Sequence, residues 1–184
     1  MKTLVLAAAL ATLAAPACAQ TAPAAPQSTQ PAASAATQTF AKTAAMTDLF
    51  EIQAGQLAEQ KSADSAYKDF AQMTIDDHTK TSDQLKGMAI AGVDLPQQLD
   101  GTHKAMIDKL GSLDGAAFDR QYKSDQVQGH RQAVGLFERY AKSGDNPALK
   151  TWAENTLPTL KTHLQHAEAL PRPKPATTGS ATRK

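Results

Sequence analysis

A 3.6-residue repeat of apolar side chains, sustained over four long segments, is the feature that most constrains how this chain can fold. Between residues 40 and 170 there are 19 Ala and 13 Leu but only three Val and four Ile, a composition that favours helices over strands. No stretch shows the sustained alternation of apolar and polar residues that is typical of a half-buried strand. The sequence therefore predicts an all-α fold.

Capping residues, glycines and prolines indicate where these segments begin and end. Long helices are expected at 40–61, 64–91, 115–142 and 146–170. Pro158 lies inside the last segment and is expected to kink it, because its ring removes one backbone hydrogen bond. The connection over 92–114 is expected to hold a short helix at 102–110. The prediction is a four-helix bundle with a short extra helix in its central connection, which runs the length of the bundle or folds back across one end.

The aromatic residues and the prolines divide the chain into parts. All nine aromatic residues lie between Phe40 and Trp152, whereas seven of the ten prolines lie outside residues 40–170. Residues 40–170 are therefore expected to form the folded domain. Residues 20–39 contain only Ala, Pro, Gln, Ser and Thr, which predicts a disordered linker. Residues 171–184 predict a disordered, Pro-rich basic tail, which either extends into solvent or contacts an anionic surface of the cell envelope.

The first 19 residues have the features of an export signal. Lys2 precedes an uncharged apolar run over residues 4–15, which is too short for a helix that spans a bilayer. Cleavage is expected after Ala19, and the alternatives are an uncleaved anchor or a lipoprotein attached through Cys18. The mature chain is expected to be periplasmic or secreted, with no transmembrane span.

Charge, cysteine content and motifs exclude several classes of function. A formal net charge of +1 gives no support for nucleic-acid binding. A single cysteine excludes an intramolecular disulfide framework and a zinc site made of several thiolates. The sequence contains no glycine-rich phosphate loop and none of the common hydrolase or zinc-protease motifs, so it does not favour an enzyme. No protein partner is indicated.

Three histidines lie on the apolar faces of three predicted helices. His78, His130 and His163 each project toward the expected core, and helix lengths place all three near the middle of the bundle. Glu51 lies at a similar height beside small residues, and Asp119 shares the line of His130. Bundles bind metals at this level through side chains on facing helices.

Two interpretations of this layer remain open. The first is a metal site made of Glu51, His78, Asp119, His130 and His163, whose imidazoles and carboxylates suit Zn, Cu or Fe. The second is a structural polar layer, in which Tyr122 and Asp119 accept hydrogen bonds from the imidazoles. The Glu-x-x-His pairs of ferritin-like di-iron sites are absent, because apolar residues stand three positions before each histidine.

Four sequence blocks carry a resemblance to a known family. They are Glu51-Ile52-Gln53-Ala54-Gly55-Gln56-Leu57-Ala58, Phe70-Ala71-Gln72-Met73 before Asp77-His78, Phe118-Asp119-x-x-Tyr122 before His130, and Leu157-Pro158-x-Leu160-x-x-His163-Leu164. Over about 40–170 the chain resembles the bacterial domain of unknown function 4142, whose members are often labelled outer-membrane or exported proteins. The resemblance implies a ferritin-like helical bundle behind an export signal and no established activity.

The resemblance also marks individual positions. The residues that match the family's blocks are Glu51, Asp77, His78, Asp119, Tyr122, His130, Pro158 and His163. Among them, Asp77, Tyr122 and Pro158 are expected to support the site rather than to bind a metal. The expected function is an exported bundle that binds a transition metal, in metal handling or stress protection. The alternative is a structural or interaction module of the cell envelope that binds no metal.

Overall fold

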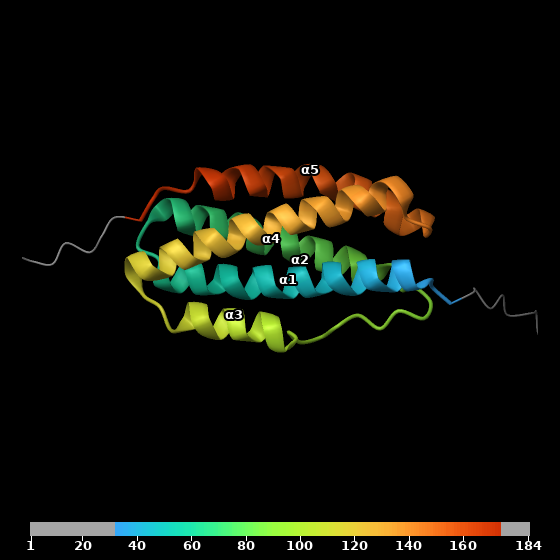
Figure 1. Ribbon diagram of the computed structural model, residues 1–184, viewed down its shortest axis with the longest axis horizontal. Helices are drawn as coiled ribbons and strands as arrows, with labels where there is room; N and C mark the ends of the chain where they lie inside the picture. Colours follow the sequence, from blue (N-terminus) through green and yellow to red (C-terminus); the bar gives the residue numbers. More distant parts are fainter. Residues whose placement is uncertain (1–31, 174–184) are drawn as a thin grey trace, which may run out of the picture.

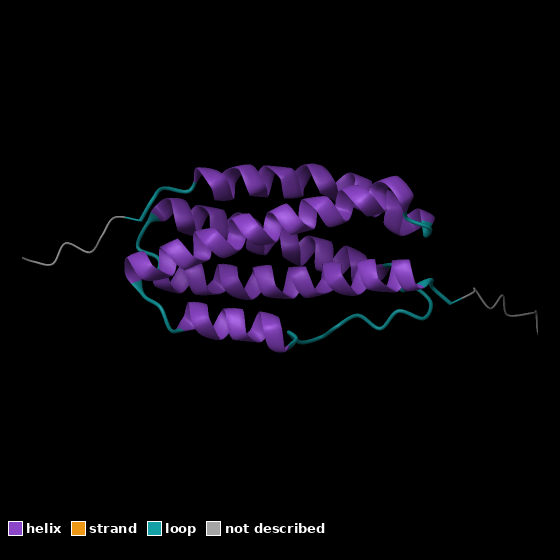
Figure 2. Cartoon of the chain, viewed as in Figure 1, coloured by secondary structure: helices purple, strands orange, loops and turns teal. Residues whose placement is uncertain are grey.

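The computed structural model describes residues 32–173, and within this range all regular structure is helical (Figure 2). The elements in chain order are α1 (Ala35–Lys61), α2 (Ser65–Gly87), α3 (Gly101–Gly111), α4 (Gly115–Ser143) and α5 (Pro147–Ala169). The predicted all-α class is confirmed. The expected signal peptide, most of the expected linker and the tail beyond residue 173 lie outside the described residues.

The four longer helices lie side by side, and the short helix lies outside them (Figure 1). α1 packs mainly against α2, and α4 packs mainly against α5. Smaller contacts join α1 to α4 and α2 to α5, so the two pairs form one bundle. The connection between α2 and α4 returns along the length of the bundle, and α3 within it contacts α1 and α4. This arrangement is the first of the two routes considered for the connection.

The start of α1 corrects a prediction from the sequence. The segment 20–39 was expected to be disordered, but α1 begins at Ala35. Ser34 caps the helix by accepting a hydrogen bond from the backbone N–H of Thr37. The buried hydroxyl of Thr37 donates to Asp145 and is hydrogen-bonded to the hydroxyl of Tyr140, both at 2.7 Å. These tertiary contacts hold a segment whose composition alone indicates disorder.

The other helix boundaries agree closely with the predicted positions, except for the end of α2. This helix ends at Gly87, four residues before the predicted end at residue 91. The backbone turns just beyond it, where Ala89 adopts a positive φ of 43°. α5 continues on both sides of Pro158.

The core consists of two apolar clusters. One contains Phe40, Leu85, Phe137, Trp152 and Leu160, and the other contains Phe50, Phe70, Leu110, Phe118 and Tyr122, among others. Each of the three central histidines lies, along its own helix, between a member of one cluster and a member of the other. The polar layer is therefore enclosed at both ends by close-packed apolar side chains. No described helix is both long enough and apolar enough to cross a membrane.

Candidate metal centre

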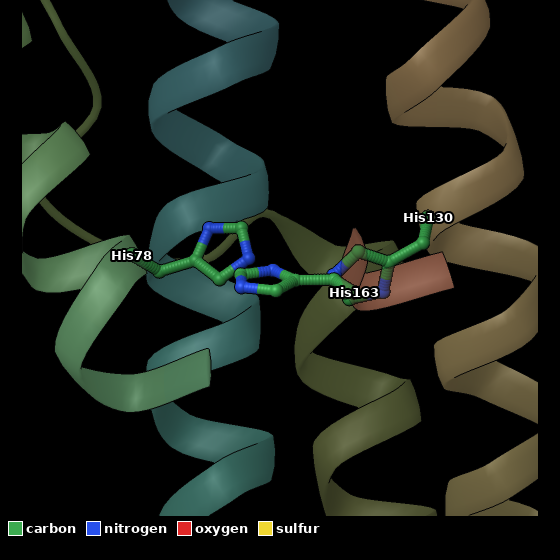
Figure 3. A group of neighbouring side chains, drawn as sticks. All are labelled: His78, His130 and His163. Carbon is green, nitrogen blue, oxygen red and sulfur yellow. The ribbon is translucent and has the colours of Figure 1, made fainter. Parts of the chain in front are cut away.

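Three histidines from three helices meet in the middle of the bundle (Figure 3). His78 comes from α2, His130 from α4 and His163 from α5, and each is at most 2% exposed. The ring centroids lie 5.3–5.7 Å apart. One ligand nitrogen from each ring lies within 4.8 Å of those of the other two. The structure therefore brings together the three histidines that the sequence predicts to face inward.

One nitrogen of each ring is held by a hydrogen-bond acceptor. Nδ1 of His78 lies 2.8 Å from Oδ1 of Asp48, and Nε2 of His163 lies 2.9 Å from Oδ2 of Asp77. Nδ1 of His130 lies 2.9 Å from the backbone carbonyl oxygen of Gln126. A carbonyl oxygen only accepts, so Nδ1 of His130 donates and its Nε2 has the lone pair when the ring is neutral. The same reasoning holds for the other two rings when Asp48 and Asp77 are ionised.

The remaining nitrogen of each ring has no partner. His78 Nε2, His130 Nε2 and His163 Nδ1 are all buried without a hydrogen bond from any described residue. Buried polar atoms are normally paired, because losing hydration without compensation costs about 1–3 kcal/mol for each atom. Three unpartnered ring nitrogens in one buried layer are the arrangement that a bound cation would satisfy.

The surroundings keep two of these imidazoles uncharged. Burial lowers the pKa of His78 to about 4, although the negative charge of Glu51 acts in the opposite direction. Burial also lowers the pKa of His163 to about 4, and its hydrogen bond to Asp77 opposes this effect. At neutral pH both rings are therefore neutral, which is the form that binds a metal.

Asp48 was not identified from the sequence, and it orients His78. It lies on α1, is 5% exposed, and also accepts a hydrogen bond from the hydroxyl of Thr81 at 3.0 Å. Burial raises the pKa of Asp48 well above its usual range, and the bond from Thr81 acts against this shift. The available signal was its position three residues before Glu51, which places both carboxylates on one face of α1.

Glu51 lies beside the histidines but outside the group of ligand nitrogens. It is 1% exposed, and its Oε2 accepts a hydrogen bond of 2.6 Å from the side-chain amide of Gln126. Its Oε1 lies 3.9 Å from Nδ1 of His130, the nitrogen that donates to the Gln126 carbonyl. Glu51 therefore faces the outer edge of His130. Gln126 was also not identified from the sequence, and it contacts both Glu51 and His130.

Asp119 and Tyr122 are buried elsewhere in α4. Asp119 is eleven residues before His130, which corresponds to about 16 Å along a helix. Burial and the charge of Asp119 together raise the pKa of Tyr67 to about 12. Tyr122 packs among aromatic rings that include Phe118 and Tyr67. Neither Asp119 nor Tyr122 hydrogen-bonds one of the three histidines, so the structure does not give them the role of acceptor considered in the structural interpretation.

The supporting residues have different positions. Asp77 lies next to His78 in sequence but hydrogen-bonds His163 on another helix. Pro158 lies five residues before His163 in α5, and its carbonyl accepts a hydrogen bond from the exposed Thr162. No described contact joins Pro158 to a histidine.

Fold and site together define a bundle of antiparallel and parallel helices with a buried three-histidine centre. The chain belongs to the family described as "Domain of unknown function (DUF4142)", which it matches over residues 22–170. This match confirms the resemblance and begins earlier than residue 40, inside the segment expected to be a linker.

Solved structures share the fold at low sequence identity. A DUF305 fragment from Deinococcus radiodurans superposes with a TM-score of 0.65 at 14% identity, covering 76% of this chain and 97% of that one. A protein described as "putative secreted protein DUF305 from Streptomyces coelicolor" gives a TM-score of 0.61 at 16% identity, covering 73% and 89%. At these identities the likeness concerns the fold alone. No curated protein matches the chain.

Proposed function

We propose that the four long helices form a bundle that binds a transition metal ion at His78, His130 and His163. The observation that carries this proposal is the set of three buried ring nitrogens without a hydrogen-bond partner. Each opposite nitrogen is fixed by an acceptor, as in metal sites where a carboxylate or carbonyl orients a ligating histidine. A layer with only a structural purpose has no need for three unpartnered ring nitrogens that face one another.

The donor set narrows the choice of metal. Three imidazoles without a thiolate suit Zn, Cu, Fe or Ni and are poor ligands for Mg or Ca. We propose Asp48, Asp77 and Gln126 as the residues that orient the ligands, and Glu51 as a nearby negative charge. In this proposal Glu51 does not bind the metal directly, and Asp119 takes no part in the site.

We further propose that the protein works outside the cytoplasm, in the handling of metal ions or in protection from metal or oxidative stress. The support comes from the export signal expected over residues 1–19 and from the fold shared with a protein described as a "putative secreted protein". Cleavage after Ala19 would remove the only cysteine. The centre would then be the metal-binding group of a chain without thiols.

The alternative is a structural module of the cell envelope, and one observation favours it. The histidine layer lies between two apolar clusters, where a polar layer can fix how the helices align along one another. In that case metal ions would leave the stability of the protein unchanged.

Calorimetric titration separates these two functions. Purified mature protein, first treated with a chelator, is titrated with Zn²⁺, Cu²⁺, Ni²⁺ and, without oxygen, Fe²⁺. A variant with His78, His130 and His163 all replaced by Gln is the test, and a His103→Gln/His166→Gln variant, altered outside the buried layer, is the matched control. We expect binding of one ion per chain in the wild type and the control, and none in the triple variant. Equal binding by a folded triple variant would overturn the proposed site.

A further inference from the structure

A groove of about 470 Å³ lies between α1 and α4 on the side of the bundle that α3 covers. α1 contributes Glu51 to its lining, α4 contributes Asp125, Gly129 and Gln132, and α3 contributes His103. α3 contacts the bundle only from outside, through α1 and α4, and Leu110 is its one buried residue among those described. The groove thus connects the outer face of the bundle with Glu51, whose Oε1 lies 3.9 Å from Nδ1 of His130.

Gly129 leaves a gap in the wall of α4 at this point. A Cβ atom at position 129 would lie 3.3 Å from Oε1 of Glu51, which is closer than ordinary contact. A glycine inside a helix costs roughly 1 kcal/mol relative to alanine. That cost is explained if the helix must leave Glu51 accessible from the groove.

Glu51 has one oxygen free to receive a cation. Its Oε2 is occupied by the amide of Gln126, whereas no described residue hydrogen-bonds Oε1. Oε1 is the oxygen next to Gly129 and also the one that lies 3.9 Å from Nδ1 of His130. It therefore lies between the groove and the outer edge of His130, on the side of the ring opposite the unpartnered Nε2.

The other polar groups of the groove suit the passage of a metal cation. Asp125 is 8% exposed and accepts a hydrogen bond from Gln121, so its carboxylate is fixed at the groove. The ring of His103 and the thioether of Met106 are further donor groups on α3. Arg139 also lines the groove, and its Nη1 lies 3.4 Å from a Cβ placed at position 135, which is six residues, or about 9 Å along α4, from Gly129.

We propose that this groove is the route by which a transition metal cation reaches the three-histidine centre, and that Glu51 receives the ion through the gap at Gly129. The inference rests on the proposed metal-binding function and adds to it a path and a receiving carboxylate. A route alters how fast an ion arrives and leaves but not the equilibrium affinity, because it does not belong to the bound state. This property distinguishes a route from a ligand.

Stopped-flow kinetics with Zn²⁺, Cu²⁺ and Ni²⁺ test the proposal, using full-length mature protein and a chromogenic chelator to follow release. Gly129→Val fills the gap, and Gln132→Trp covers the groove from an exposed position that does not touch the core. The matched controls are Gly135→Val, on the same helix but outside the groove lining, and Gln72→Trp, on the exposed face of α2. Equilibrium affinity is measured for every variant by calorimetry.

We expect both groove variants to slow uptake and release together, by about tenfold, with Kd unchanged for Gln132→Trp. The two controls should exchange metal at the wild-type rates. If Gln132→Trp and Gly129→Val both exchange metal as fast as the controls, the proposed route is wrong. The proposed metal centre is not affected by that result. If the wild type binds none of the three ions at equilibrium, the proposed metal centre is wrong, and the proposed route is then wrong as well.

Discussion

At the scale of single residues, the centre depends on acceptors that hold the outer nitrogen of each ring. The phase of each helix predicted which histidines face inward, because helical geometry fixes the direction of a side chain. Asp48 and Gln126 could not be predicted in the same way. Their contacts with His78 and His130 depend on how the helices rotate against one another and on hydrogen bonds to a side chain or a backbone carbonyl. The sequence does not specify either.

Removing one of these acceptors should weaken metal binding without unfolding the protein. We expect Asp77→Asn to lower the affinity of the centre by about 10–100-fold, because an amide holds the ring of His163 less firmly and no longer raises its basicity. Asp76→Asn is the matched control, since Asp76 is the preceding residue and its carboxylate hydrogen-bonds the exposed Gln72. Calorimetric titration of both variants measures the difference. Equal affinities would show that Asp77 does not orient the ligand.

The low pKa of His163 predicts how stability depends on pH in metal-free protein. Its pKa is about 4 in the folded chain and about 6.5 when unfolded. Between these values the unfolded chain binds the proton and the folded chain does not. The contribution of His163 to the free energy of unfolding is therefore fully present above pH 6.5 and is lost as the pH falls toward 4.

The comparison with His163→Gln isolates this effect. Both proteins keep Asp48, whose raised pKa acts with the opposite sign, so its contribution largely cancels in the difference. We expect the free energy of unfolding of the wild type to fall, relative to the variant, by roughly 1 kcal/mol per pH unit below pH 6.5. Urea unfolding at pH 7, 6 and 5 measures this. A difference that is constant over that range would contradict the neutral, buried state of His163.

At the scale of helices, the first turn of α1 shows where composition misleads. Ala, Ser, Thr and Gln around residues 34–39 have no large apolar side chain, and such segments are usually disordered. The helix forms because Thr37 reaches residues more than 100 positions away, on α4 and in the turn before α5. Contacts so distant in sequence leave no local pattern that a reader of the sequence could use.

Replacing this threonine should therefore loosen the first turn of α1. We expect Thr37→Val to destabilise the protein by about 1–3 kcal/mol, because it removes one buried and one partly buried hydrogen bond and leaves the hydroxyl of Tyr140 with one partner fewer. Thr162→Val is the control, as that hydroxyl is exposed and bonds only the carbonyl of Pro158. Thermal unfolding of the two variants is the measurement. Equal losses would mean that the contacts of Thr37 do not hold the helix.

At the scale of the whole molecule, the three histidines of the proposed centre come from both halves of the bundle. His78 belongs to the α1–α2 pair, and His130 and His163 belong to the α4–α5 pair. The all-α class could be predicted from the composition and the 3.6-residue repeat of apolar side chains. The route of the central connection could not be predicted, since the two candidate routes contain the same residues. The structure shows that the connection returns along the bundle, which makes α2 and α4 run in the same direction.

A metal ion should therefore stabilise the packing of one pair against the other. We expect Tm to rise with metal concentration, by about 2.7 kcal/mol in stability at a hundredfold excess over Kd. Amide hydrogen exchange should slow in α2, α4 and α5 together and less in α3, which supplies no ligand. Exchange that slows in one helix pair alone would contradict a centre shared between the pairs. The triple histidine variant should show neither change.

The direction of the helices also separates the two ends of the described chain. Residue 32 lies at one end of the bundle and residue 173 at the other (Figure 1). A helix of 27 residues, the length of α1, extends for about 40 Å. The two ends of the described chain are therefore separated by roughly the length of the bundle, with the histidine layer near its midpoint.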